Sequence, residues 1–251
     1  MKKQFLFFAF AALLMLGSCK KDEVTVPQTF KGAEQTLGSG KAYSWVTFSA
    51  DNLPTAVGMT FTKGAFENLS HTALTALALK LPTEAVGKTP FDHIFLTFSH
   101  TGHEPPGIYD VAHFDIHFYM QSLAEREVIP PYMPATAAKF DNLPADGYMP
   151  KPYFRLPEGV PTMGTHWANP TSAELNGGKF TETFIMGSYD GKVTFYEPMV
   201  TLALLQSSPN ITKAAPIATK FTKAGYYAMK YSIKQNGDNV DVSLDELIMM
   251  Q

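Results

Sequence analysis

The sequence has little cysteine, little charge and no long apolar run beyond its first residues. Cys19 is the single cysteine among 251 residues, so no intrachain disulfide can form. Only 17% of the residues are charged, and no lysine or arginine cluster follows the amino-terminal region, which argues against nucleic-acid binding. The chain also lacks a phosphate loop, a dinucleotide fingerprint, a Gly-x-Ser-x-Gly elbow and a His-Glu-x-x-His helix. The sequence therefore has none of the motifs that would indicate one of these enzyme classes.

The first residues have the pattern of an export signal. Lys2 and Lys3 precede an apolar run over residues 5–16, which is too short to span a bilayer comfortably. The segment ends Leu16-Gly17-Ser18-Cys19, which resembles the lipobox of bacterial lipoproteins and implies a lipid on Cys19. An ordinary signal peptide with a chance cysteine is the alternative. We expect residues 1–19 to be a lipoprotein signal peptide and the exported protein to be anchored in the cell envelope, at the outer membrane.

The residues after Cys19 have the composition of a tether. Lys20-Lys21-Asp22-Glu23 is charged, and the following residues have little hydrophobic periodicity, so we expect a flexible tether over residues 20–40. A charged, acidic tether resembles the surface-export signals of some Gram-negative lipoproteins, which adds surface exposure as a weaker expectation. Residues 41–251 are long enough to bury a sizeable core, and we expect one β-rich domain there.

Most segments of that domain read as short strands separated by turns. Residues 42–49 alternate apolar and polar side chains, and residues 93–98 are rich in β-forming types. Asp190-Gly191 separates two β-rich runs, as a type I′ hairpin requires, and residues 236–239 separate the last two runs. The pattern predicts a mainly β fold, a barrel or sandwich of antiparallel strands, with one or two short helices, one of them within residues 121–129.

Residues 130–161 differ from the rest of the chain because prolines and aromatic residues are concentrated there. We interpret this segment as a long ordered loop or lid that its own aromatic side chains hold together. A loose surface excursion is the alternative.

The stretch His113 to Tyr119 (HFDIHFY) carries the strongest chemical signal. Side chains alternate between the two faces of a strand, so His113, Asp115 and His117 would share one face. Imidazole and carboxylate groups on a stiff strand can bind a divalent metal. The alternative is a structural polar face on which Asp115 orients a histidine by a hydrogen bond.

Four residues outside this strand are further candidates. His103 and Glu104 lie on a turn just before it and could act as acid and base, as could Asp115. His166, in a Gly-Thr-His-Trp stretch, is the best candidate for a third imidazole, and a satisfied core histidine is the alternative. Glu197 shares its expected strand face with apolar residues, so it needs a partner, a metal or a raised pKa, unless it ends an exposed edge strand.

The motifs HFDIHFY, MGTHW and GSYDGKVTFYEPM resemble those of an uncharacterised family of secreted bacterial proteins and lipoproteins. The resemblance covers roughly residues 40–205 and implies that the motifs belong to one domain. The family has no established activity, so the resemblance implies neither a reaction nor a metal.

Two main function hypotheses follow. In the first, a membrane-anchored envelope lipoprotein binds zinc, iron, copper or manganese through His113, His117, His166 and Glu197. In the second, a non-enzymatic envelope protein uses the same polar clusters structurally and binds a small molecule, a glycan or a second copy of itself. A carbohydrate-binding module would require Trp45, Trp167 or tyrosines to lie exposed on one flat face. The sequence does not decide whether the protein is an enzyme.

Overall fold

The computed structural model describes residues 26–251. The expected signal peptide and Cys19 lie outside the described residues. Within residues 26–251, no helix is both long enough and apolar enough to cross a membrane.

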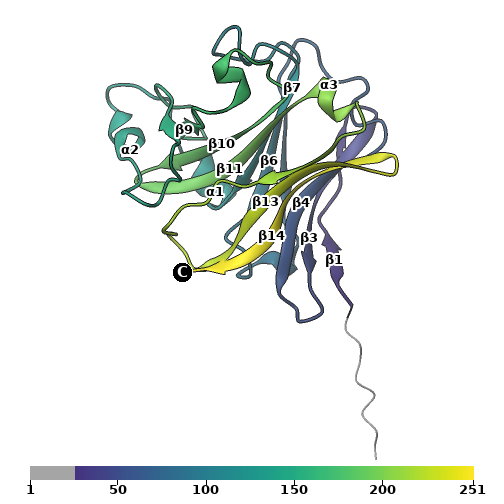
Figure 1. The fold of residues 1–251 in the computed structure, drawn as a ribbon. Helices are drawn as coiled ribbons and strands as arrows, with labels where there is room; N and C mark the ends of the chain where they lie inside the picture. The colour runs from purple at the N-terminus through teal and green to yellow at the C-terminus, as the bar shows by residue number, and fades with distance from the viewer. Residues whose placement is uncertain (1–25) are drawn as a thin grey trace, which may run out of the picture.

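Two antiparallel sheets of seven strands each make up the domain. Figure 1 shows how the sheets are arranged. The first sheet has the order β1-β3-β4-β14-β13-β12, with β2 paired to β3. Its strands are β1 (Gln28–Lys31), β2 (Gln35–Leu37), β3 (Gly40–Phe48), β4 (Pro54–Phe61), β12 (Asn210–Ala214), β13 (Gly225–Asn236) and β14 (Asn239–Met250). The prediction of a mainly β fold is confirmed, and the two separate sheets form a sandwich rather than a barrel.

The second sheet has the order β5-β6-β7-β11-β10-β9-β8. Its strands are β5 (Thr75–Lys80), β6 (His93–Ser99), β7 (His113–Tyr119), β8 (Phe154–Arg155), β9 (Thr165–Ala168), β10 (Glu182–Tyr189) and β11 (Lys192–Thr201). Strands β7 and β11 are therefore neighbours in the middle of the sheet, where their backbone groups are paired on both sides.

The helices of the described residues are short. They are α1 (Leu123–Glu127), α2 (Ala137–Asp141) and α3 (Leu202–Leu205), with single 3₁₀ turns at Thr83–Ala85 and Ala173–Asn176. Helix α1 lies in the region predicted to be helical. Its Ser122 and Glu125 form a reciprocal capping box, in which each side chain accepts a hydrogen bond from the other residue's backbone.

The core fills the space between the two inner sheet faces. Phe114, Ile116 and Phe118 of β7 are fully buried there, against residues of the first sheet such as Met59 and Phe61. A smaller apolar cluster lies on the opposite, outer face of the second sheet, where Tyr109 and Phe180 cover it. Because both faces of β7 are covered, all seven of its residues are buried.

The segment predicted to be a lid is ordered and packs on its own aromatic side chains. The rings of Tyr132 and Phe140 meet edge to face at 5.4 Å, and Phe140 meets Tyr189 of β10 at 5.1 Å. These contacts attach α2 and the surrounding loops to the second sheet, to the left of β10 and β11 in Figure 1.

One boundary differs from the prediction. The expected flexible tether over residues 20–40 includes β1 and β2, which both pair with β3. Phe30 packs against Phe48 at 5.8 Å, and Leu37 is buried in the main core. Isolated apolar residues anchor this segment, so it shows little periodicity in the sequence, and the folded domain begins before residue 41.

The two predicted hairpins are confirmed. Asp190 and Gly191, both at positive φ (49° and 77°), join β10 to β11, as a type I′ turn requires. Strands β13 and β14 pair along their whole length up to Asn236 and Asn239.

Candidate metal centre

The outer face of β7 carries three titratable side chains in a row. His113, Asp115 and His117 point to this face because the strand is regular, and their exposures are 0%, 6% and 1%. The prediction that they share one strand face is confirmed. Burial on the outer face comes from the loops that cover the sheet, so these groups are removed from water without being in the main core.

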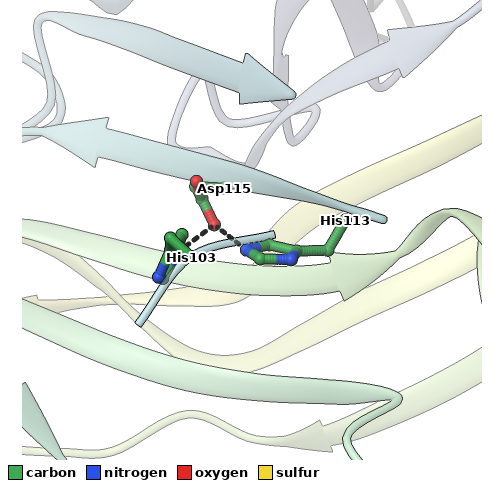
Figure 2. Close-up of side chains that lie close together, drawn as sticks. All are labelled: His103, His113 and Asp115. Atoms are coloured by element: carbon green, nitrogen blue, oxygen red, sulfur yellow. Dashed lines mark ion pairs between the residues drawn. The ribbon is translucent and has the colours of Figure 1, made fainter. Parts of the chain in front are cut away.

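The first group of side chains converges on one oxygen of Asp115 (Figure 2). The Nε2 atom of His113 lies 3.0 Å from Asp115 Oδ1, and the Nε2 atom of His103 lies 3.6 Å from the same oxygen. The other oxygen of Asp115 accepts a hydrogen bond of 2.8 Å from Thr97 on β6. His103 reaches the site from the loop before β7, and its side chain is 46% exposed, so this group opens to solvent. We call His103, His113 and Asp115 the Asp115 group.

The second group lies further along the same face. The Nε2 atom of His117 is 3.3 Å from Glu197 Oε1, and the Nε2 atom of His166 is 3.7 Å from Glu197 Oε2. Glu197 on β11 faces His117 because the register of β7 and β11 pairs Met199 with Asp115. We call His117, His166 and Glu197 the Glu197 group. Within each group, the potential ligand atoms all lie within 4.8 Å of one another.

Glycines let His166 approach this face. His166 on β9 pairs with Gly187 on β10, and the ring of Phe195 occupies the space above that glycine. A Cβ atom at Gly187 would lie 1.9 Å from the Phe195 ring. Gly164 precedes β9 at a φ of 106°, and a Cβ atom there would lie 2.4 Å from the carbonyl oxygen of Ser188. The backbone at Gly164 therefore approaches β10 too closely for any side chain.

Backbone carbonyls fix the orientation of three of the imidazoles. The Nδ1 atom of His113 lies 2.7 Å from the Val111 carbonyl oxygen, that of His117 lies 3.1 Å from Phe95, and that of His103 lies 2.7 Å from Glu104. A carbonyl oxygen can only accept a hydrogen bond, so each Nδ1 must carry the proton. In the neutral imidazole, Nε2 then presents a lone pair.

These lone pairs face carboxylate oxygens, which also only accept when ionised. Four of the facing atoms are buried without a hydrogen-bond partner: His113 Nε2, Asp115 Oδ1, His117 Nε2 and Glu197 Oε2. A buried acceptor without a partner costs about 1–3 kcal/mol of stability. Either protons or a cation between the facing acceptors removes this cost. Histidine ligands of metals usually donate their other ring N–H in the same way, often to a backbone carbonyl.

The two groups differ in their protonation. In the Asp115 group, burial opposes ionisation of Asp115, but the nearby imidazoles of His103 and His113 outweigh it and lower the pKa of Asp115. Burial likewise lowers the pKa of His103, but the close Asp115 carboxylate outweighs it, and the net pKa is raised. The Asp115 group is therefore stabilised as an ion pair.

In the Glu197 group, burial dominates. Burial raises the pKa of Glu197 well above its usual value, and the negative charge of Asp115 adds to the effect. Burial lowers the pKa of His117 to about 3 and that of His166 to about 4. The imidazoles are therefore neutral at pH 7, as metal binding requires. Of the alternatives that the sequence left for Glu197, an exposed strand end is excluded because the residue is 2% exposed.

The structure thus divides the four residues predicted as metal ligands. His117, His166 and Glu197 come together, whereas His113 joins His103 and Asp115, two of the candidates for acid and base. Glu104, the third candidate, is exposed and meets the site only through its backbone carbonyl.

Other polar and aromatic residues lie elsewhere. His100 is exposed and stacks on His71 at 4.1 Å, away from both groups. Trp167 is 9% exposed and belongs to the main core, whereas Trp45 lies on the first sheet. The two tryptophans do not form the flat exposed platform that a carbohydrate-binding module would require.

Two further buried polar residues lie on the outer face. Glu174 is 7% exposed and accepts a hydrogen bond of 3.3 Å from Tyr109, beside the Asp115 group. Arg126 of α1 is 5% exposed. Glu174 follows a Pro-Thr-Ser-Ala turn, from which the sequence allows it to cap a helix or reach the site. Arg126 has no sequence signal, because a charged residue in a short helix is usually exposed.

A cavity of about 320 Å³ lies at one end of the sandwich. Its wall includes Gln121, Thr194, Tyr196 and Tyr227, and it contains none of the six residues of the two groups. The two groups lie elsewhere, on the outer face of the second sheet.

Comparisons with protein-family models, curated proteins and solved structures gave no match. The resemblance of the HFDIHFY, MGTHW and GSYDGKVTFYEPM motifs to a family of secreted bacterial proteins stays a prediction.

Proposed function

We propose that this protein is an envelope lipoprotein whose β-sandwich binds divalent metal ions on the outer face of β7. The observation that carries the proposal is the set of buried acceptors that face one another in the Glu197 group. His117, whose Nδ1 is committed to the Phe95 carbonyl, points its unpartnered Nε2 at Glu197 Oε1, and the unpartnered Oε2 of Glu197 faces His166 Nε2. A metal ion satisfies both kinds of acceptor at once.

The Glu197 group is the stronger of the two candidate sites. Two neutral imidazoles and one carboxylate form the ligand set that catalytic zinc sites and non-haem iron sites use. Three protein ligands leave coordination positions for water or a substrate, so this set supports metal-assisted chemistry as well as simple binding. The Asp115 group has the same composition, but its exposed His103 makes it the weaker site.

Zinc, iron, copper and manganese are all compatible with histidine and carboxylate ligands. The expected lipid on Cys19 would anchor the domain to the membrane through the segment before β1, which agrees with an envelope location. The alternative function is a metal-free binding or structural protein in which the two groups hold protons.

Calorimetric titration of the metal-free protein with zinc and manganese tests the proposal. We expect binding that releases protons, since the metal displaces the protons shared by the facing acceptors. The matched control is the variant His71→Ala, which removes an exposed histidine outside both groups. Wild-type protein that binds neither metal, or that binds no better than a variant with both His113 and His117 changed to alanine, would support the metal-free alternative.

A further inference from the structure

Arg126 is a buried cation without an acidic partner. It is 5% exposed, and within residues 26–251 it forms no ion pair. The chain's other arginine, Arg155, pairs with Asp141. A guanidinium group stays protonated at all physiological pH values, so burial cannot neutralise it as it neutralises a lysine or a histidine. An unpaired buried charge opposes folding unless something compensates it.

The surroundings compensate Arg126 only in part. Its guanidinium carbon lies 3.5 Å from the centre of the Phe95 ring and 5.4 Å from that of Tyr119, which gives a cation–π attraction. One terminal nitrogen donates a hydrogen bond of 3.4 Å to Thr162. The Nε atom is buried and has no partner, and neither has the hydroxyl group of Tyr119. A donor and a hydroxyl are thus left free beside a positive charge.

This unsatisfied cation lies beside the Glu197 group. The Phe95 ring under the guanidinium is 6.1 Å from the ring of His117, and the Tyr119 ring is stacked 5.6 Å from it. All three aromatic residues project from the outer face of β6 and β7, because Phe95 pairs with His117 in the sheet. The positive charge of Arg126 also contributes to the lowered pKa of His117.

We propose that Arg126 and Tyr119 bind the oxyanion of a small organic ligand, a carboxylate or a phosphate ester, next to the Glu197 group. A planar guanidinium presents paired N–H donors that match two oxygens of such a group, and the Tyr119 hydroxyl adds a third donor. The inference rests on the proposed metal site in one respect: the other end of the ligand would lie at the open coordination positions there. Capture of the anion itself needs no metal.

The test compares Arg126→Met with Arg155→Met by calorimetric titration of the metal-free chain, residues 20–251, with oxalate and with inorganic phosphate. We expect wild type and Arg155→Met to bind at least one anion, and Arg126→Met to bind it at least about 10-fold more weakly. Binding of oxalate alone would identify a carboxylate ligand, and binding of phosphate alone a phosphorylated one.

Thermal unfolding separates a binding role from a structural one. Methionine replaces the buried charge with an apolar chain, so we expect Arg126→Met to unfold at the same temperature as wild type or higher. If Arg126→Met does not fold, Arg126→Lys keeps the charge without the planar fork and should still weaken anion binding. Equal anion affinity in wild type and the Arg126 variant, or no binding by wild type at millimolar anion, would overturn the proposal.

Elemental analysis of Arg126→Met keeps this inference separate from the metal proposal. We expect the variant to hold as much metal as wild type, because Arg126 is a member of neither group. Failure of anion binding with metal retained would count against the Arg126 inference alone, whereas metal-free wild type would count against the metal site.

Discussion

Glu197 lies on a strand face that it shares with apolar residues, and both of its carboxylate oxygens face imidazoles. Burial raises its pKa well above its ordinary value of 4.5. A carboxyl group whose pKa is raised by folding contributes stability below its unfolded pKa, and this contribution is lost as the pH rises through the folded pKa. In metal-free protein, Glu197 therefore destabilises the folded state increasingly as the pH rises above about 4.5.

This pH dependence predicts how the variant Glu197→Gln should behave. In chelator, its free energy of unfolding should rise relative to that of wild type as the pH increases from 4.5 toward 8, because glutamine cannot ionise. Urea unfolding at several pH values measures the difference. With metal present, wild type should instead be the more stable of the two proteins. The metal affinity of Glu197→Gln should be at least about 10-fold lower than that of wild type. A variant that unfolds at every pH would show instead that Glu197 is a structural partner.

Strand β7 contributes one histidine to each group, so single substitutions in this strand can test the two groups separately. His113→Ala should remove the metal bound at the Asp115 group, and His117→Ala that bound at the Glu197 group. The double variant should bind no metal and retain its β signal in circular dichroism, because the inner face of β7 is unchanged. Metal retained by the double variant would contradict the assignment of these ligands.

Strand β10 supports the Glu197 group through Gly187. A methyl group at this position would collide with Phe195, whose ring contacts those of His117 and His166 at 4.9 Å and 5.2 Å. Gly187→Ala should cost about 1–3 kcal/mol of stability. It should also weaken metal binding at the Glu197 group more than at the Asp115 group, as calorimetric titration of the His113→Ala and His117→Ala backgrounds would show. Equal weakening of both would point to general destabilisation.

Local sequence patterns predicted the strands well and the composition of the groups less well. The alternation in HFDIHFY was sufficient to place His113, Asp115 and His117 on one face. The partners of these residues depend on strand order: β7 pairs with β11, not with β10, and only this pairing brings Glu197 opposite His117. The sequence predicted His113 as a ligand together with Glu197, because the order of strands in a sheet cannot be read from one sequence.

At the scale of the whole molecule, loops between strands cover the outer face and bury most side chains of the two groups, while His103 is left partly exposed. The covering segments include residues 100–112 before β7 and the segment that carries α1 and α2. The sequence predicted that the proline-rich part is ordered. It could not show that Arg126 is buried beneath this cover, because burial there depends on contacts of α1 with Phe95 and Thr162.

The proposed lipid anchor is predicted from the sequence alone and concerns the whole molecule. Replacing Cys19, the chain's single cysteine, by serine should remove the proposed site of lipid attachment. The variant should leave the membrane fraction in detergent-free fractionation and lose incorporation of radiolabelled palmitate, with metal binding unchanged. A Cys19→Ser protein that still sediments with membranes would argue for a different means of attachment.

Elemental analysis of the chain from residue 20 onward, purified without a metal-binding tag, tests the central claim most directly. We predict near-stoichiometric zinc, iron, copper or manganese that is lost when both His113 and His117 are changed to alanine. Protein that is free of metal, and that neither binds added metal nor gains thermal stability from it, would contradict the account.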